Sequence, residues 1–141
     1  MRVLILSGEE VRAALGRDAC ERAMATVLAD RARGVAHCPL RSVSFPPGAP
    51  GFMGLMPAYA SGDGAGGGAA GEGGAAGVFA LKAICLMPGN SRLGLDTHQG
   101  TVTLFDGATG VPTAIVDASA VTEIRTAAVT ALATRTLARP E

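Results

Sequence analysis

Strand-like segments are clustered between residues 52 and 116 of this sequence, and helical patterns lie before and after them. The most strand-like run, Val78 to Met87, is apolar over most of its length and is followed by Pro88-Gly89-Asn90. Two shorter runs flank Asp106 to Gly110, which has the composition of a β-hairpin loop. Strands that follow one another in this way predict an α+β domain with a mainly antiparallel sheet.

The N-terminal region predicts a short strand over residues 3–6 and then two helices that pack on the sheet. Ser7 and Glu10 have the spacing of a capping box, and Asp18 with Glu21 repeats this pattern ahead of the second helix. Gly34 is suited to end that helix, because glycine accepts the left-handed conformation of a C-cap. An apolar stripe along the second helix indicates a face that lies against the sheet.

The middle of the chain predicts extended structure and one glycine-rich insertion. A strand that begins near Phe52 is expected to end at Pro57. Residues 61–77 contain almost only glycine and alanine, which bury too little surface to offset the entropy of ordering them, so they predict a flexible loop within a single domain spanning residues 1–141. Residues 62–67 half-resemble a dinucleotide-binding turn, but they lack the buried strand before it and the packed helix after it.

Composition excludes several classes of protein. Twelve basic and twelve acidic residues leave no surplus of positive charge for nucleic acid or an anionic membrane. Three cysteines without a CxxC pair favour reduced thiols, and no apolar run is long enough to span a membrane, so we expect a soluble cytoplasmic protein. His37 and His98 lack the spacing of metal ligands, so no metal is expected.

Lys82 interrupts the apolar strand that begins at Val78. A charge in the middle of a strand is costly unless it is paired or faces a wet cleft, so one reading is a functional lysine that faces such a cleft. The alternative is an edge-strand lysine that blocks sheet aggregation, and the position alone favours neither reading.

The last helix is expected to begin with Thr122 as its N-cap and to end near Leu137. Arg125 would then lie in the first turn, where the helix dipole favours anions over cations. A bound anion, held by free backbone N–H groups and the guanidinium, would reconcile the two. The alternative is an arginine paired with Glu123, Asp117 or another local acid.

Several motifs together resemble the ornithine cyclodeaminase/mu-crystallin family, over nearly the whole chain. The glycine-rich stretch at 61–77 departs from the family, in which a shorter turn joins the two strands. The motifs follow the family's order: Met56-Pro57-Ala58-Tyr59, Leu81-Lys82, Pro88-Gly89-Asn90, Thr97-His98-Gln99-Gly100, Leu104-Phe105-Asp106, Thr109-Gly110-Val111-Pro112 and Thr122-Glu123-Ile124-Arg125-Thr126-Ala127-Ala128.

The resemblance implies roles for individual residues. Lys82 matches the family's active-site lysine, and Arg41 and Arg125 match arginines that bind the substrate carboxylate. Thr97 matches a threonine that touches the cofactor. The residue types agree, because two guanidinium forks and a point charge suit recognition of one carboxylate. Met53 and Met56 are expected to line the apolar side of this pocket.

The resemblance also implies chemistry in which hydride passes between a substrate carbon and NAD or NADP, as in cyclodeamination of L-ornithine to L-proline and ammonia, imine or ketimine reduction, or amino-acid dehydrogenation. The sequence stops at Glu141, before the family's Rossmann half, so we expect the isolated chain to be inactive and to hold no cofactor stably. It is expected to dimerise through its sheet. The alternative function is a stand-alone binding or dimerisation module without turnover, and a generic α+β domain is a third reading.

Overall fold

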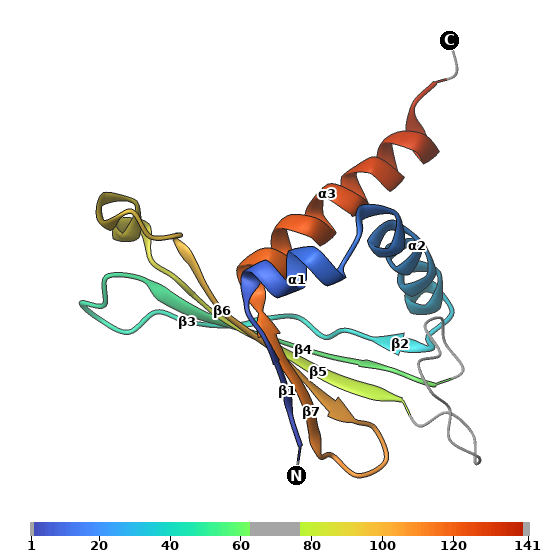
Figure 1. The fold of residues 1–141 in the computed structure, drawn as a ribbon, viewed down its shortest axis with the longest axis horizontal. Coiled ribbons are helices and arrows are strands. Elements are labelled where there is room, and N and C mark those ends of the chain that lie inside the picture. Colours follow the sequence, from blue (N-terminus) through green and yellow to red (C-terminus); the bar gives the residue numbers. More distant parts are fainter. Residues whose placement is uncertain (1, 63–76, 140–141) are drawn as a thin grey trace.

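The computed structural model describes residues 2–62 and 77–139, which form one mixed sheet with three α-helices on one side of it (Figure 1). The expected loop over 61–77 falls largely outside the described residues. The strands run in the order β1-β7-β6-β5-β4-β2, and β3 pairs beside β2 along β4. The elements are β1 (Leu4–Leu6), α1 (Gly8–Ala14), α2 (Arg17–Ala32), β2 (Ala36–His37), β3 (Ser42–Ser44), β4 (Phe52–Ala60), β5 (Val78–Leu86), η1 (Pro88–Leu93), β6 (His98–Asp106), β7 (Pro112–Asp117) and α3 (Ala118–Leu137).

The predicted α+β class and mainly antiparallel sheet are confirmed. The only parallel pair in the described sheet joins β1 to β7, and the other strand pairs are antiparallel. The hairpin predicted around Asp106–Gly110 links β6 to β7. Asp106 caps its turn, because its Oδ1 accepts hydrogen bonds from Thr109 N at 2.8 Å and Ala108 N at 3.2 Å. Among the described residues, no strand–turn–helix unit of the Rossmann type occurs.

The prediction that β4 ends at Pro57 is wrong, since this strand continues to Ala60. On one edge of β4, Pro57 is opposite Leu81 of β5. On the other edge, Pro57 lies between the part of β4 that pairs with β3 and the part that pairs with β2. Proline has no N–H to donate, and at this position no neighbouring described strand pairs with it on that edge. The gap between β3 and β2 therefore lets a proline remain inside a long strand.

Gly100 allows β5 and β6 to approach each other closely. Its φ is +157°, and a Cβ at this position would lie 2.1 Å from the carbonyl oxygen of Ala83 and 2.7 Å from Cα of Ile84. Real Cβ atoms do not approach backbone atoms so closely, so a side chain here would force the two strands apart. This glycine therefore determines the fit of the two central strands.

The N-terminal helices are held differently from each other. The capping box of α1 is confirmed, with Glu10 Oε2 accepting from Ser7 N at 2.8 Å. The helix α2 begins one residue before Asp18, so Gly16 is the N-cap and Asp18 lies in the first turn. Gly34 follows the C-cap with φ +76°, as expected. The helix α2 reaches the sheet at β2, and it packs mainly against α3.

The long helix α3 begins at Ala118, earlier than predicted. Asp117 is its N-cap and accepts a hydrogen bond from Ala120 N at 2.7 Å, so the prediction of Thr122 as N-cap is wrong. An aspartate directly after the last strand is a better start, since its carboxylate reaches the free N–H groups of the first turn. Arg125 consequently lies about two turns inside the helix, and the argument from the helix dipole does not apply to it.

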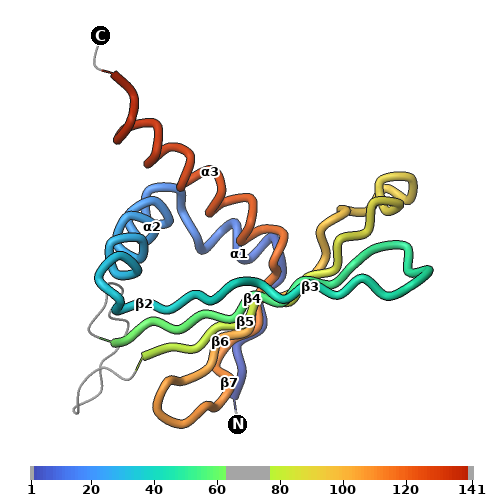
Figure 2. Tube along the Cα trace, turned by 180° about the vertical axis from the view of Figure 1, so that it is seen from behind, coloured from blue at the N-terminus to red at the C-terminus, as the bar shows by residue number. Residues whose placement is uncertain are grey.

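The core lies where α1 and α3 meet the sheet and where α2 packs against α3, and its buried apolar side chains are small or medium-sized. The opposite face of the sheet is left open in the described structure, and all three helices lie on the other side (Figures 1 and 2). The core residues are Val11, Cys20, Ile84, Ala114, Ala118, Ala120 and Ala128.

Candidate functional site

Lys82 lies in the middle of β5, on the face of the sheet that α3 crosses. It is half-buried, and the alternation of side chains along a strand places it on the same face as the buried Ile84. Its Nζ donates a hydrogen bond to Oγ1 of Thr122 in α3. The mid-strand lysine therefore points at the helix, and β5 is paired on both edges, so Lys82 is not an edge-strand lysine.

Thr122 has a different place from the one that the sequence indicates. Its hydroxyl donates to the carbonyl oxygen of Ala118 at 2.6 Å, one turn earlier in α3. Because that proton is directed to the backbone, the hydroxyl oxygen is left to accept from Lys82. Reasoning from the sequence missed this contact; the signal was Asp117, which starts the helix early and turns Thr122 into an interior residue.

Arg125 and Arg41 approach Lys82 from two directions. Arg125 is three residues after Thr122, so the two side chains lie on the same side of α3. Arg41 directly precedes β3, whose first residue pairs with Leu55, while Lys82 pairs with Met56 on the other edge of β4. The strand register therefore aligns Arg41 with Lys82, and the contact between Lys82 and Thr122 brings α3, with Arg125, to the same region.

The electrostatics of Lys82 reflect this grouping. Burial lowers the pKa of its amine, and the positive charges of Arg125 and then Arg41 lower that pKa further. Within the described residues, none of the three cations forms an ion pair with a carboxylate. The two acids nearest to Arg125 in the sequence have other partners, since Glu123 pairs with Arg12 at 3.0 Å and Asp117 caps α3.

Thr97 lies apart from these three residues. It precedes β6, and its carbonyl oxygen accepts from Met87 N at 2.8 Å, whereas Lys82 pairs with Val102. Five residues along a strand correspond to about 17 Å. Its hydroxyl makes no hydrogen bond to the described part of the chain.

The two methionines expected near Lys82 lie on opposite faces of β4. Met56 pairs with Lys82, shares its face and is half-buried. Met53 is an odd number of residues away and therefore points to the open face, where it is 45% exposed. The expectation is wrong for Met53, and only Met56 lies beside the lysine.

His98 has a structural neighbour in α3. Its Nδ1 lies 3.3 Å from Oγ of Ser119, and Ser119 Oγ also donates to the carbonyl oxygen of His98. Asp96 accepts from His98 N at 3.0 Å, and this backbone hydrogen bond holds the pKa of Asp96 below its usual value. The described residues contain no group of three or more side chains suited to holding a metal ion.

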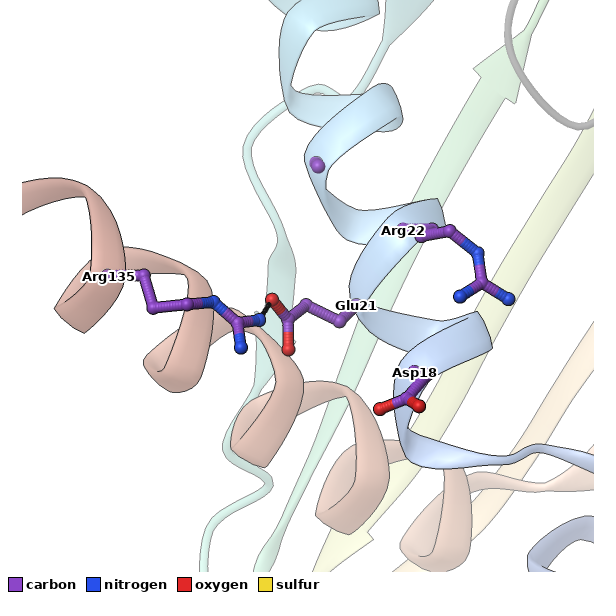
Figure 3. Close-up of a pocket in the computed structure, with 5 residues that line it drawn as sticks. Asp18, Glu21, Arg22 and Arg135 are labelled. Carbon is purple, nitrogen blue, oxygen red and sulfur yellow. Dashed lines mark ion pairs between the residues drawn. The ribbon is translucent and has the colours of Figure 1, made fainter.

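Two surface pockets lie away from Lys82. One lies between α2 and α3, where Arg135 forms an ion pair with Glu21 and where Asp18 and Arg22 also line the pocket (Figure 3). The other is apolar and lies at the end of the sheet, lined in part by Phe52, Cys85 and Met87. Neither pocket contains Arg41, Lys82, Thr97 or Arg125, whereas Met53 lines the second pocket.

Among the described residues, no helix has the length and apolar character needed to cross a membrane.

Comparison with known proteins gives a consistent result. The model of the ornithine cyclodeaminase/mu-crystallin family matches residues 1–141. Ketimine reductase mu-crystallin of Mus musculus is 34% identical over 90 residues, which make up 64% of this chain and 25% of the mouse protein.

Solved structures match over almost the whole chain. An archaeal alanine dehydrogenase dimer with bound NAD superimposes with a TM-score of 0.83 at 29% identity, over 99% of this chain and 38% of that one. The Δ1-pyrroline-2-carboxylate reductase of Thermococcus litoralis, in complex with NADH and L-proline, gives a TM-score of 0.82 at 26% identity, over 97% of this chain and 38% of that one. This chain thus spans less than half the length of these relatives.

Proposed function

The chain belongs to the ornithine cyclodeaminase/mu-crystallin family, and we propose that it is the substrate-binding part of an NAD-dependent enzyme acting on a small amino or imino acid. In this proposal Arg125 and Arg41 bind the substrate carboxylate, and Lys82 contacts the substrate beside it. The chain spans 38% of the length of these solved relatives, and the activity in this proposal is that of the whole enzyme.

One observation carries the proposal: Lys82 is half-buried beside two arginines, and none of these cations has a carboxylate partner within the described residues. Grouping like charges costs free energy, so such a cluster is expected where an anion binds. A guanidinium recognises a carboxylate through two parallel hydrogen bonds, whereas an ammonium acts as a point charge. A single carboxylate would offset part of the repulsion that lowers the pKa of Lys82.

The reaction class follows from what the relatives bind. The similar reductase holds NADH and L-proline, and the similar dehydrogenase holds NAD. NAD(H), when bound, would exchange hydride with the substrate carbon that bears nitrogen. The residues described here would orient that carbon by fixing the carboxylate next to it. Thr97 is the only cofactor contact we assign to this chain, and its unbonded hydroxyl fits that role.

We also propose that two copies of the chain pair through the open face of the sheet. Leu55 and Phe79 lie on that face, opposite to Lys82, and are 37% and 48% exposed. An apolar sheet face that helices leave uncovered is suited to protein contact. The similar alanine dehydrogenase is a dimer.

L-Proline titrated into the protein and followed by NMR tests the carboxylate site. Loss of a hydrogen bond to a charged group costs about 1.5–3 kcal/mol, so Arg125→Ala should weaken binding by about tenfold or more. Arg92→Ala is the matched control, since Arg92 is an exposed arginine in η1. Equal affinity of the wild type and Arg125→Ala for L-proline would contradict the proposal.

A further inference from the structure

Lys82 is the only lysine in the sequence; the other eleven of the twelve basic residues are arginines. Arginine stays protonated at every pH that a protein experiences, whereas a lysine amine can lose its proton and become a nucleophile. The single position in this chain that uses lysine is therefore the half-buried one between two arginines. A guanidinium there would supply charge but not a reactive nitrogen.

The hydrogen bonds of Thr122 orient this nitrogen. Since the Thr122 hydroxyl gives its proton to Ala118 O, its oxygen can only accept, and Nζ of Lys82 must donate to it. In the neutral amine, the N–H that points at Thr122 leaves the lone pair directed elsewhere. The nitrogen is thus held by a neutral acceptor, and no carboxylate among the described residues stabilises its charged form.

The surroundings also favour the neutral amine. Burial and the charges of Arg125 and Arg41 lower the pKa of Lys82, which raises the fraction of unprotonated nitrogen. Lysines made reactive in this way are known nucleophiles toward carbonyl groups. A bound carboxylate would cancel only one of the two neighbouring positive charges, so the effect would persist in the presence of an anionic ligand.

We propose that Lys82 forms an imine with the carbonyl carbon of a small 2-oxo acid whose carboxylate lies between Arg125 and Arg41. This inference rests on the carboxylate site of the proposed function. The lone pair of Nζ forms a C–N bond as the carbonyl π bond breaks, and the oxygen takes up a proton to give a carbinolamine. Both protons of the amine are released: one balances the proton taken up by the oxygen, and the other leaves with the hydroxyl as water when the C=N bond forms. The step requires neither oxidant nor reductant.

Borohydride trapping tests this step, with pyruvate as the probe. The protein is incubated with pyruvate and sodium borohydride, and the reduced adduct is located by mass spectrometry of the intact chain and of its peptides. The expected adduct adds one pyruvate, less one water, plus two hydrogens, at Lys82. The only other primary amine in the sequence is the α-amino group of Met1, which peptide mapping separates from Lys82.

Variants test whether Lys82 is the reacting residue and whether Arg125 positions pyruvate beside it. The Lys82→Arg and Lys82→Met variants should form no adduct at position 82. Arg125→Ala should form it about tenfold more slowly, as expected for loss of a charge-assisted contact. Arg92→Ala should match the wild type. Circular dichroism of each variant separates loss of reactivity from loss of folding, and two replacements at position 82 keep the test valid if one does not fold.

The outcomes separate this inference from the function on which it rests. If L-proline binds the wild type but binds Arg125→Ala more weakly, and pyruvate gives no adduct at Lys82, the carboxylate site stands and the imine is wrong. An adduct confined to the terminal amine also overturns the imine. An adduct at Lys82 that forms equally fast in Arg125→Ala overturns the assigned orientation and, with unchanged L-proline binding, the carboxylate site as well.

Discussion

The amine of Lys82 in β5 donates a hydrogen bond to the hydroxyl of Thr122, forty residues later in α3. This contact joins the middle of the sheet to the helix that crosses it. Its acceptor is neutral, so the charge of the lysine is solvated by a hydroxyl without being balanced by a carboxylate. A partly buried cation without a carboxylate partner is expected to lower the free energy of unfolding, which is a common cost of a binding site.

Lys82→Met should therefore stabilise the fold near neutral pH, by up to about 1 kcal/mol after allowance for solvent screening. The folded-state pKa of Lys82 lies below the unfolded value, so between the two values the unfolded chain binds more protons and wild-type stability rises with pH. The variant lacks this contribution, and its advantage should shrink at pH ~9.5. Urea unfolding at both pH values measures the difference; a gap that widens with pH would show the sign to be wrong.

Asp117→Ala should destabilise the chain by about 1 kcal/mol, because it removes the side chain that accepts from Ala120 N at the start of α3. Asp117→Asn should retain most of the stability, since asparagine is an equally good N-cap. Urea titrations of the two variants make the comparison. Equal losses for both would mean that the carboxylate acts through something other than the cap.

Gly100→Ala should destabilise the protein by about 2–5 kcal/mol, because its methyl group would meet the backbone of β5. Gly94→Ala is the control: it has φ +69° but no heavy atom within 4 Å of the added Cβ. That variant carries only the conformational cost of about 1 kcal/mol. Thermal unfolding of both variants isolates the steric contribution, and equal melting temperatures would refute the close approach of the two strands.

Leu55→Glu should shift the chain from dimer to monomer in sedimentation velocity, because a charge would be buried in the proposed interface without a partner. Leu93→Glu changes an equally apolar residue in η1, 72% exposed and outside the open sheet face, and should leave the distribution unchanged. A wild-type chain that sediments as a monomer at micromolar concentration would count against this interface.

Structural elements that are set by residues close together in the sequence could be predicted from it. The run from Val78, the hairpin at Asp106–Gly110 and the capping box of Ser7 and Glu10 are local patterns, and each is confirmed. The start of α3 was missed because two residues, Asp117 and Thr122, both suit an N-cap, and the end of β7 decides between them. The sequence predicts a strand end at Pro57 because the gap between β2 and β3 depends on residues far from it in the chain.

The sequence by itself determined the types of element, their order, the motifs of the family and the residues proposed for the site. Tertiary structure decided which of those residues meet. Arg41, Lys82 and Arg125 are far apart along the chain, and they converge because the register of β3, β4 and β5 aligns two of them while α3 crosses above with the third. Such long-range pairing depends on the whole sheet. Short-range spacing therefore predicts the strand that contains Lys82 but not Thr122, the residue to which it donates.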